Sequence, residues 1–517
     1  MNKVSFLKLF LVLLVILIVG LILRLSHINF GLPLTYFIDE TDRSDPAVSY
    51  VLNYKTAIQN KDINFFKPTS YIKGTFNTYF IALSVIVFNE LASLFGVVFN
   101  QFNYVVEMRI ITALVSMLIP VITGFIHFLL FKDKKGLVLS VFLTTLNWKL
   151  INHSIYINQD IFLTFCVMLS YLFLLLYFNY ENRKKSLLLI YLSGAAFGLA
   201  FGTKVTALIA FPVFGLLFIS RKNWKGIVLF GLAALISFII TNPFSLIAFN
   251  DFITRIFEMS SREGGVVFGS VDLNPFKYII NLNHMLTLPI LLISLYGAYI
   301  SYKKANEKFF HLFLFFNVLT YVLFFSLASR NSERYLLPTL PVIIIYASYG
   351  ISYLYNHIEI NKYLALAILV LVTGYYLYFP LSLFLQLTHN KPRVDAYYWM
   401  KQQASDSKIL VYTEDGRDPF SSIKGADVTV FSVYVSSGAQ YVMPKDPMQY
   451  EYVVLSSKPM EDFKRDYVVK TYPEYSTNWK NFENLVTASG KFKLVKEFRT
   501  TNLNLLYFSD IAIYKKI

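Results

Sequence analysis

The stretch IITALVSMLIPVITGFIHFLLF, residues 110–131, contains no formally charged residue. About 20 predominantly apolar residues are enough for a helix to cross the hydrocarbon core of a bilayer. Other apolar runs of similar length recur along the chain, which has 517 residues, 56% of them hydrophobic and only 15% charged. Because a soluble domain carries about 25% charged residues, the sequence predicts a polytopic α-helical membrane protein.

The net charge of +15 does not indicate a nucleic-acid partner. Lys and Arg mark the ends of apolar runs and form no single basic stripe, as orientation signals do. The positive-inside rule therefore predicts that four short basic loops are cytoplasmic. These loops are KDKK (132–135), ENRKK (181–185), RKNWK (221–225) and YKKANEK (302–308).

The N-terminal apolar segment begins with Lys3 and Lys8, which place the N-terminus in the cytoplasm. It lacks a small-x-small cleavage site, so we interpret it as a retained signal anchor. About eleven spans follow from the apolar runs, which puts the C-terminus outside. The expected spans are 6–24, 110–131, 136–152, 161–180, 187–203, 205–220, 226–243, 284–301, 309–328, 336–355 and 362–386.

Residues 79–100 are long enough to span but do not fit this topology. If they crossed the membrane, every basic loop after them would be inverted, and Glu90 would be costly at bilayer depth. We therefore expect a helix in the outer interface, within an external loop of residues 25–109. This choice places that loop, Asp160 and the 244–283 loop on one side of the membrane.

A change of composition near residue 390 predicts a transmembrane domain of residues 1–389 and an external α/β domain of residues 390–517. PRVDAYYWMKQQA (392–404) is typical of an amphipathic helix. Several segments have the pattern of strands. They are KILVYT (408–413), DVTVFSVYV (427–435), YEYVVLSS (450–457), KFKLVKEF (491–498) and LNLLYF (503–508). The single Cys166 allows no intrachain disulfide.

Two groups of external carboxylates are candidates for chemistry. In FIDETDRSDP (37–46), Asp39 and Glu40 follow a short apolar lead and are held close to the membrane surface. A carboxylate there can act on a lipid headgroup while the lipid tail stays in the bilayer. Asp160 lies where a helix begins at the outer face, and its alternative role is a favourable charge at a helix N-terminus. Ordinary solvated loop charges are the alternative for the first group.

External cations break the positive-inside pattern and are candidates for binding a phosphate at headgroup level. Snorkelling of these side chains to the interface is the alternative. The candidates are Lys204, Arg330, Arg334 and Arg109. Motifs of soluble enzymes are absent, with no P-loop, GxGxxG, HExxH or CxxC. The outer histidines have no metal-ligand spacing, and His127 is expected to be a buried packing residue. The outer histidines are His27, His153 and His284.

The ordered set of segments resembles the GT-C glycosyltransferases, in the branch of protein O-mannosyltransferases and aminoarabinose transferases. The segments that carry the resemblance are GLPLTYFIDETDRSDPAVSYVLN (31–53), KGTFNTYFIALSVIVFNELASLFG (73–96), VEMRIITALVSMLIPVITGFIHFLLF (106–131), NWKLINHSIYINQDIFLTF (147–165), GLAFGTKVTALIAFPVFGLL (198–217) and RNSERYLLPTLPVIII (330–345). The resemblance covers residues 1–390 and implies a sugar donor linked to a polyprenyl or dolichyl phosphate, with a glycan, lipid or protein as acceptor.

The resemblance implies that Asp39 is the catalytic base, with Glu40 as its neighbour, and that Asp160 is the acidic residue of the second external loop. Ile38 stands where the family often has His or Pro, which leaves the subfamily open. Some relatives use Mg, Mn or Zn and others use no metal, so metal dependence is also open. The candidate ligands are Asp39, Asp160, Glu258 and Glu263.

Rival functions come from two other classes. A transporter or flippase of lipid-linked glycans would place ionisable groups near the bilayer midplane and show paired or broken helices. A polysaccharide polymerase or ligase would also be a multi-spanning enzyme with external loops. This chain keeps its charges at the ends of the apolar runs, which favours surface chemistry. The sequence therefore predicts a glycosyltransferase of a bacterial-type inner or plasma membrane.

Overall fold

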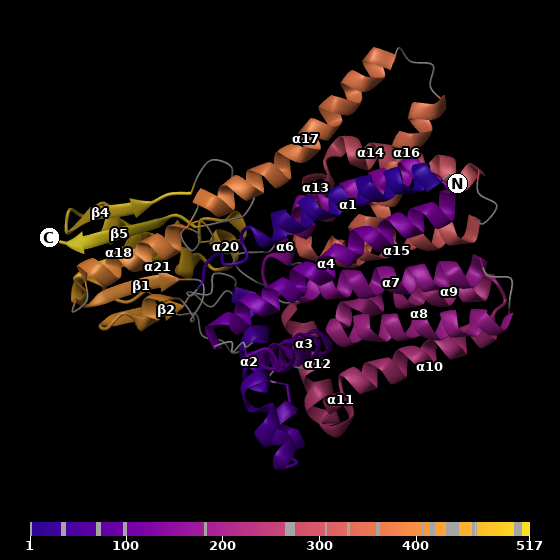
Figure 1. Cartoon of the computed structure of the whole chain (residues 1–517). Coiled ribbons are helices and arrows are strands. Elements are labelled where there is room, and N and C mark those ends of the chain that lie inside the picture. Colours follow the sequence, from indigo (N-terminus) through magenta and orange to yellow (C-terminus); the bar gives the residue numbers. More distant parts are fainter. Residues whose placement is uncertain are drawn as a thin grey trace.

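The structure is a computed structural model that describes most of the chain. It covers residues 3–32, 38–68, 74–96, 101–179, 183–263, 274–304, 308–327, 331–357, 362–389, 391–404, 407–413, 419–430, 444–457, 461, 463–500 and 509–517. Within these ranges some side chains, including those of 38–39 and 258–263, are not described. Figure 1 shows a bundle of long helices with a small sheet domain at one end and the N-terminus at the other.

The bundle consists mainly of helices that run side by side along its length. They are α1 (Lys3–Leu25), α4 (Gln101–Phe131), α7 (Gln159–Asn179), α8 (Arg183–Thr203), α9 (Phe211–Ser220), α10 (Trp224–Thr241), α15 (Lys308–Leu327) and α16 (Leu340–His357). Helix α17 (Lys362–His389) runs obliquely away from the bundle in Figure 1. Glycines let α8 approach α10 closely, since a Cβ on Gly194 would lie 2.4 Å from the carbonyl oxygen of Phe230. Small residues at such contacts are the usual means of packing helices in membranes.

The structure gives a range for the number of membrane-crossing helices. Among the described residues, eight helices are long and apolar enough to cross a membrane, and a bent helix pair would make nine. Two further apolar helices, Leu187–Thr203 and Val205–Ser220, are shorter. A polytopic helical membrane protein is therefore confirmed, whereas the expected count of about eleven is not.

One predicted span is interrupted. The expected helix 136–152 is divided into α5 (Lys134–Thr145) and α6 (Trp148–Ser154). The side-chain oxygen of Asn147 accepts hydrogen bonds from the backbone N–H groups of the next helical turn, 3.1 Å away. This is an N-cap, so a new helix begins where the sequence suggested a continuous one. The expectation of one continuous helix here was wrong.

A second predicted span is bent. The expected helix 284–301 lies across α13 (Lys277–Leu286) and α14 (Leu288–Lys304), which meet at 102°. Thr287, at the bend, has a φ of 73°, a conformation that is uncommon for a β-branched residue. The 310-helices η2 (Val205–Ile209) and η3 (Glu333–Thr339) begin two other expected helices, before α9 and α16.

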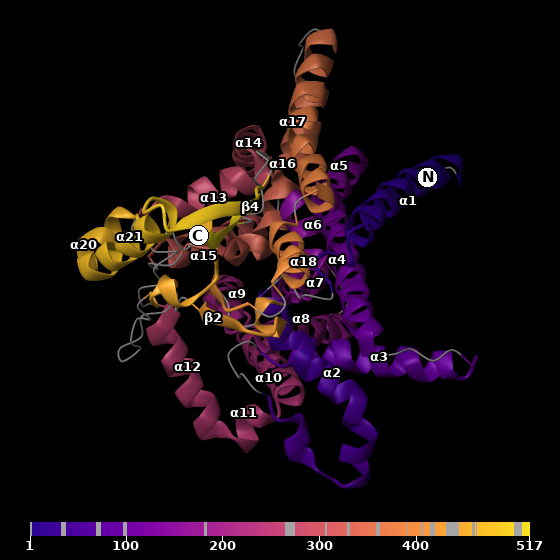
Figure 2. The same ribbon diagram turned by 90° about the vertical axis from the view of Figure 1, so that its left-hand side faces the viewer.

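Helix α3 (Phe76–Ser93) corresponds to the expected interfacial helix. It is one of the helices long enough to span, yet Figure 2 shows it lying across the view, whereas α7 and α8 are seen nearly end-on. It packs beside α2 (Ile38–Gln59), which is followed by η1 (Ile63–Phe66). The expected loop 244–283 contains α11 (Phe244–Ile247) and α12 (Phe249–Glu263). The orientation of α3 supports an interfacial position, which remains a proposal.

The predicted cytoplasmic loops lie together at one end of the bundle. The guanidinium of Arg221 lies 5.2 Å from the rings of both Phe178 and Phe309, which flank two of the other basic loops. The C-terminal end of α7 and the start of α8 lie at the end opposite the sheet domain (Figure 1). His127 is fully buried near this end and contacts the carbonyl oxygen of Ile345 at 3.2 Å, as expected for a packing residue.

The C-terminal domain is a five-stranded sheet with the order β2-β1-β3-β5-β4. The strands are β1 (Ile409–Thr413), β2 (Ala426–Val430), β3 (Tyr452–Ser456), β4 (Phe492–Phe498) and β5 (Ile511–Lys516). The first three strands are parallel, and β5 is antiparallel to β3 and β4. Helix α18 (Pro392–Gln403) packs through Met400 on the sheet face of Ile409, and α21 (Pro473–Thr487) packs through Trp479 on the face of Tyr412.

The α/β domain is thus confirmed, and four of its five strands coincide with predicted segments. β5 was missed, and the predicted strand 503–508 lies outside the described residues. The remaining short elements are η4 (Pro419–Ser422), η5 (Pro447–Gln449) and α20 (Asp466–Thr471). The exact boundary at residue 389 remains a prediction.

Candidate functional site

The carboxylate pair of the first external loop lies at the start of α2. The side chain of Glu40 is completely buried and accepts two hydrogen bonds from the guanidinium of Arg109, at 2.7 and 2.6 Å. The backbone N–H of Ile157 donates a third, at 3.0 Å, to the same carboxylate. Both oxygens of Glu40 are therefore occupied. The side chain of Asp39 is not among those described, but its neighbour is held rigidly.

Arg109 was predicted to contact phosphate, and its side chain is engaged with groups of the protein instead. Besides Glu40, its guanidinium donates to the carbonyl oxygens of Ile28 at 2.7 Å and Phe30 at 2.9 Å. The side chain is fully buried. Arg109 thus ties α4 to the end of α1 and to α2, which makes it part of the scaffold. The same contacts make Glu40 an anchor for the segment that carries Asp39.

The second buried ion pair joins α7 to the end of α8. The ammonium of Lys204 lies 2.7 Å from Oδ1 of Asp160, whose side chain is only 2% exposed. The same ammonium lies 4.8 Å from the centre of the Tyr335 ring. Oδ2 of Asp160 is buried and has no hydrogen-bond partner within the described part of the chain. This pair therefore retains a vacant acceptor oxygen, unlike the pair of Glu40 and Arg109.

The two arginines near residue 330 differ in what the structure describes. Arg330 lies outside the described residues. Arg334 is half-buried on η3, with its guanidinium 6.0 Å from the Tyr335 ring that Lys204 also approaches. Lys204 and Arg334 are 130 positions apart in the sequence, yet the fold brings Lys204 to Tyr335, the residue that follows Arg334. This juxtaposition is what a phosphate site at the end of the bundle requires.

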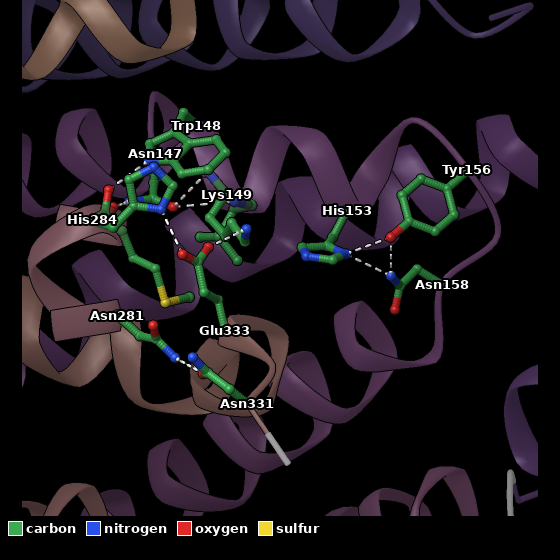
Figure 3. Close-up of polar contacts among 12 residues, drawn as sticks. Asn147, Trp148, Lys149, His153, Tyr156, Asn158, Asn281, His284, Asn331 and Glu333 are labelled. Atoms are coloured by element: carbon green, nitrogen blue, oxygen red, sulfur yellow. Dashed lines mark hydrogen bonds and ion pairs between the residues drawn. The ribbon is translucent and has the colours of Figure 1, made fainter. Parts of the chain in front are cut away.

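A third charged cluster was missed by the sequence analysis (Figure 3). Glu333 forms ion pairs with Lys149 and with His284, whose Nδ1 lies 2.5 Å from the carboxylate. The indole N–H of Trp148 donates to the carbonyl oxygen of His284 at 3.1 Å. The cluster therefore joins α6, α13 and η3. Lys149 lies within an expected span, and a charge at such a position is itself a signal of function.

His153, on α6, lies between the pair of Lys149 and Glu333 and the side chains of Tyr156 and Asn158 (Figure 3). Its Nδ1 contacts the hydroxyl of Tyr156 at 2.6 Å and the side-chain amide nitrogen of Asn158 at 2.7 Å. Burial lowers the pKa of His153 well below its ordinary value, and the positive charges of Lys149 and Arg334 lower that pKa further. The ring is therefore neutral, and its side chain is only 6% exposed.

The described residues do not fit a metal centre. No group of three or more His, Cys, Asp or Glu side chains within the described ranges could hold a metal ion. Asp160 faces the ammonium of Lys204, which disfavours a nearby cation. The other three candidates, Asp39, Glu258 and Glu263, have side chains that are not described. We therefore derive no step that uses a metal.

Comparison with known proteins gives the class of the chain. Residues 55–254 match the family described as dolichyl-phosphate-mannose-protein mannosyltransferase. No curated protein sequence matches.

Solved structures share the fold. The chain is similar to ArnT from Cupriavidus metallidurans bound to undecaprenyl phosphate, with 12% identity and a TM-score of 0.54 over 99% of this chain and 98% of that one. It is also similar to the oligosaccharyltransferase AglB from Archaeoglobus fulgidus in complex with an inhibitory peptide and a dolichol-phosphate. That match has 15% identity and a TM-score of 0.54 over 89% of this chain and 71% of that one. An oligosaccharyltransferase from Archaeoglobus fulgidus in complex with Zn and sulfate matches with 15% identity and a TM-score of 0.53, over 87% and 69% of the two chains.

The shared fold is that of the GT-C glycosyltransferases ArnT and AglB, and the family match over residues 55–254 agrees with it. The predicted fold is thereby confirmed, and the predicted enzyme class agrees with the family match. Within that class, the chain carries a domain similar to those of the protein mannosyltransferases, joined to a small C-terminal α/β domain.

Proposed function

We propose that this protein transfers a sugar from a polyprenyl-phosphate donor to an acceptor at the end of the bundle that carries the sheet domain. The observation that carries the proposal is the position of Lys204, which approaches Tyr335, the neighbour of Arg334, and pairs with the buried carboxylate of Asp160. Lys204 and Arg334 both lie within electrostatic range of His153. Cations placed in this way stabilise the negative charge that develops on a departing phosphate. The lipid phosphates bound by ArnT and AglB agree with this donor class.

The proposed reaction needs a base for the acceptor, and we assign this role to Asp39. Its carboxylate takes the proton from the acceptor hydroxyl or amine, the acceptor atom bonds to the anomeric carbon, and the bond from that carbon to the phosphate oxygen breaks. The lipid phosphate leaves with the electron pair. The ion pair of Glu40 with Arg109 supports the assignment, because it immobilises the residue next to Asp39.

A metal ion is not required by this proposal. The Zn and sulfate in one archaeal structure suggest a metal for that enzyme. Here the described residues provide no set of ligands. The side chains of Asp39, Glu258 and Glu263 are not among those described, so chelation with EDTA is the test: loss of turnover that added Mg, Mn or Zn restores would show that they complete a metal site with Asp160.

Transport is the rival that one observation favours, since α13 and α14 form a broken helix. However, the break adjoins the cluster of His284, Glu333 and Lys149, at the same end of the bundle as Asp160. It does not place a charge midway along the bundle. The enzyme proposal therefore accounts better for the position of the ionisable groups.

The direct test is to incubate the purified full-length protein with a panel of polyprenyl-phosphate sugars and to measure release of the free lipid phosphate. Release with at least one donor, dependent on an added acceptor, is the expected result. Movement of intact lipid-linked sugar across vesicles without cleavage would support the transporter instead.

The proposed orientation has the N-terminus in the cytoplasm and the site outside. Single cysteines introduced at positions 90 and 104, with Cys166 replaced by Ala, should both react with an impermeant reagent added from outside. Labelling of position 104 only from the cytoplasm would show that α3 spans the membrane, and the shared outer site would then be excluded.

A further inference from the structure

The ring of His153 has one occupied edge and one vacant edge. Nδ1 contacts Tyr156 and Asn158, as described above. Nε2 is buried and has no hydrogen-bond partner among the described residues. Buried polar atoms in folded proteins almost always have partners, so an exception at a functional site calls for a ligand.

The hydrogen-bond network sets the position of the imidazole proton. The side-chain oxygen of Asn158 accepts from the backbone N–H of Asp160 at 2.7 Å, which fixes the orientation of the amide. Its NH2 group must then face both Nδ1 of His153 and the hydroxyl of Tyr156. An NH2 group can only donate, so Nδ1 must be the acceptor. The proton of the neutral ring is therefore on Nε2.

The vacant edge faces the charged part of the site. In Figure 3, Nδ1 points toward Tyr156 and Asn158, and the opposite side of the ring is turned toward Lys149 and Glu333. His153 also lies within electrostatic range of Lys204 and Arg334. A buried N–H donor surrounded by three cations and one carboxylate favours an anionic oxygen as its partner.

Resting on the proposed function, we propose that His153 binds the donor. The Nε2–H of His153 donates a hydrogen bond to a non-bridging oxygen of the donor's phosphodiester, an oxygen that the departing lipid phosphate retains. Asn158 and Tyr156 are positioning residues that hold the donating tautomer. The neutral imidazole contributes a hydrogen bond of defined direction, whereas Lys204 contributes positive charge. The side-chain amide of Asn158 contacts both the ring of His153 and the backbone N–H of Asp160, at the start of α7. Asn158 therefore orients both His153 and Asp160.

The test compares two substitutions of His153. The amide nitrogen of Gln falls near the position of Nε2, whereas the shorter Asn places its amide near Nδ1. His153→Gln therefore keeps the proposed donor, and His153→Asn loses it. The dissociation constant for undecaprenyl phosphate should increase by about 10-fold or more in the Asn variant, because hydrogen bonds to charged groups contribute about 1.5–3 kcal/mol. The Gln variant should stay within about threefold of the unmodified protein.

Undecaprenol, which lacks the phosphate, should bind equally well to both variants, and inorganic phosphate serves as a competitor that separates the headgroup from the chain. His27→Asn is a matched control that should leave the dissociation constant unchanged. The Nε2 of His27 lies 2.9 Å from the hydroxyl of Thr388, which belongs to neither charged cluster. Equal affinity in both His153 variants and the unmodified protein would overturn the inference. Equal weakening in both variants, or a parallel loss for undecaprenol, would also overturn it. Failure of the unmodified protein to bind undecaprenyl phosphate would instead remove the proposed function.

Discussion

Two buried ion pairs occupy the same end of the bundle but differ in what remains vacant. Glu40 and Arg109 form a bidentate pair in which backbone groups occupy the remaining positions, and neither side chain is exposed. Asp160 and Lys204 share one contact, and Oδ2 of Asp160 has no hydrogen-bond partner among the described residues. The first pair connects three helices, whereas the second borders the cluster of cations.

The difference separates scaffold from site. A saturated ion pair has no capacity to bind a ligand, and its value lies in holding chain segments in place. A pair that leaves a buried oxygen without a protein partner keeps the capacity to accept a hydrogen bond from a water or a substrate. The same residue types thus have different roles because of their remaining hydrogen-bond capacity.

The largest expected effect is loss of stability in Arg109→Gln. The amide of Gln cannot serve both oxygens of Glu40 and two carbonyl groups, so a buried charge is left without its partner. Removing one member of such a pair costs about 3–5 kcal/mol. The apparent unfolding temperature in detergent should fall sharply. A variant with unchanged unfolding temperature and weaker donor binding would show that Arg109 belongs to the site after all.

Substitutions of Asp39 and Glu40 test the distinction between site and scaffold by measuring turnover. Asp39→Asn should reduce turnover by about 10²–10⁴-fold at saturating donor, because the base is lost while binding is kept. Glu40→Gln should mainly lower the unfolding temperature. If Asp39→Asn retains normal turnover and Glu40→Gln is inactive at unchanged stability, the base is Glu40. If both remain active, the glycosyltransferase mechanism proposed here is excluded.

Lys204→Gln should have an intermediate effect on binding. Its loss removes the charged contact that we propose with the phosphate, so the KM for the lipid donor should increase by about 10-fold. Steady-state kinetics across donor concentration measures this change. Lys149→Gln is the comparison variant at the neighbouring cluster. An unchanged KM in Lys204→Gln would argue that this lysine only neutralises Asp160.

The smallest effect is expected at an exposed pair. Lys67 and Asp251 lie 2.8 Å apart, but their side chains are 44% and 56% exposed. Lys67→Gln should cause only a small change in the free energy of unfolding, since solvent screens such pairs. The unfolding temperature again measures it. A fall in unfolding temperature as large as that of Arg109→Gln would show that burial does not determine how much each ion pair contributes to stability.

Much of the architecture was predictable because apolar periodicity acts locally. The apolar runs, the basic loops and the start of the C-terminal domain follow from stretches of about 20 residues or fewer. Strand β5 was missed although Ile511 and Ile513 alternate with less buried neighbours, which is the pattern of a half-buried strand. Its signal was available in IAIYKK, but the preceding LNLLYF is more apolar and was chosen instead.

The interruptions of helices were not predictable, because their causes lie elsewhere in the chain. Asn147 begins α6 with its own oxygen, but its amide nitrogen donates to the carbonyl oxygen of Met285 at 3.0 Å and to the hydroxyl of Tyr376 at 3.2 Å. Those partners are more than 100 positions away. The local sequence around Asn147 is apolar enough to continue a span, so only the tertiary contacts account for the break.

The sequence alone determined that this is a polytopic membrane protein with acidic and basic residues at the ends of its spans, because hydrophobicity and charge are properties of composition. It also placed Asp39, Asp160, Lys204 and Arg334 among the candidates. Only the tertiary structure decided which charges pair. Glu40 meets Arg109 and Asp160 meets Lys204 across helices distant in the sequence, and desolvation in the folded bundle makes those pairings decisive.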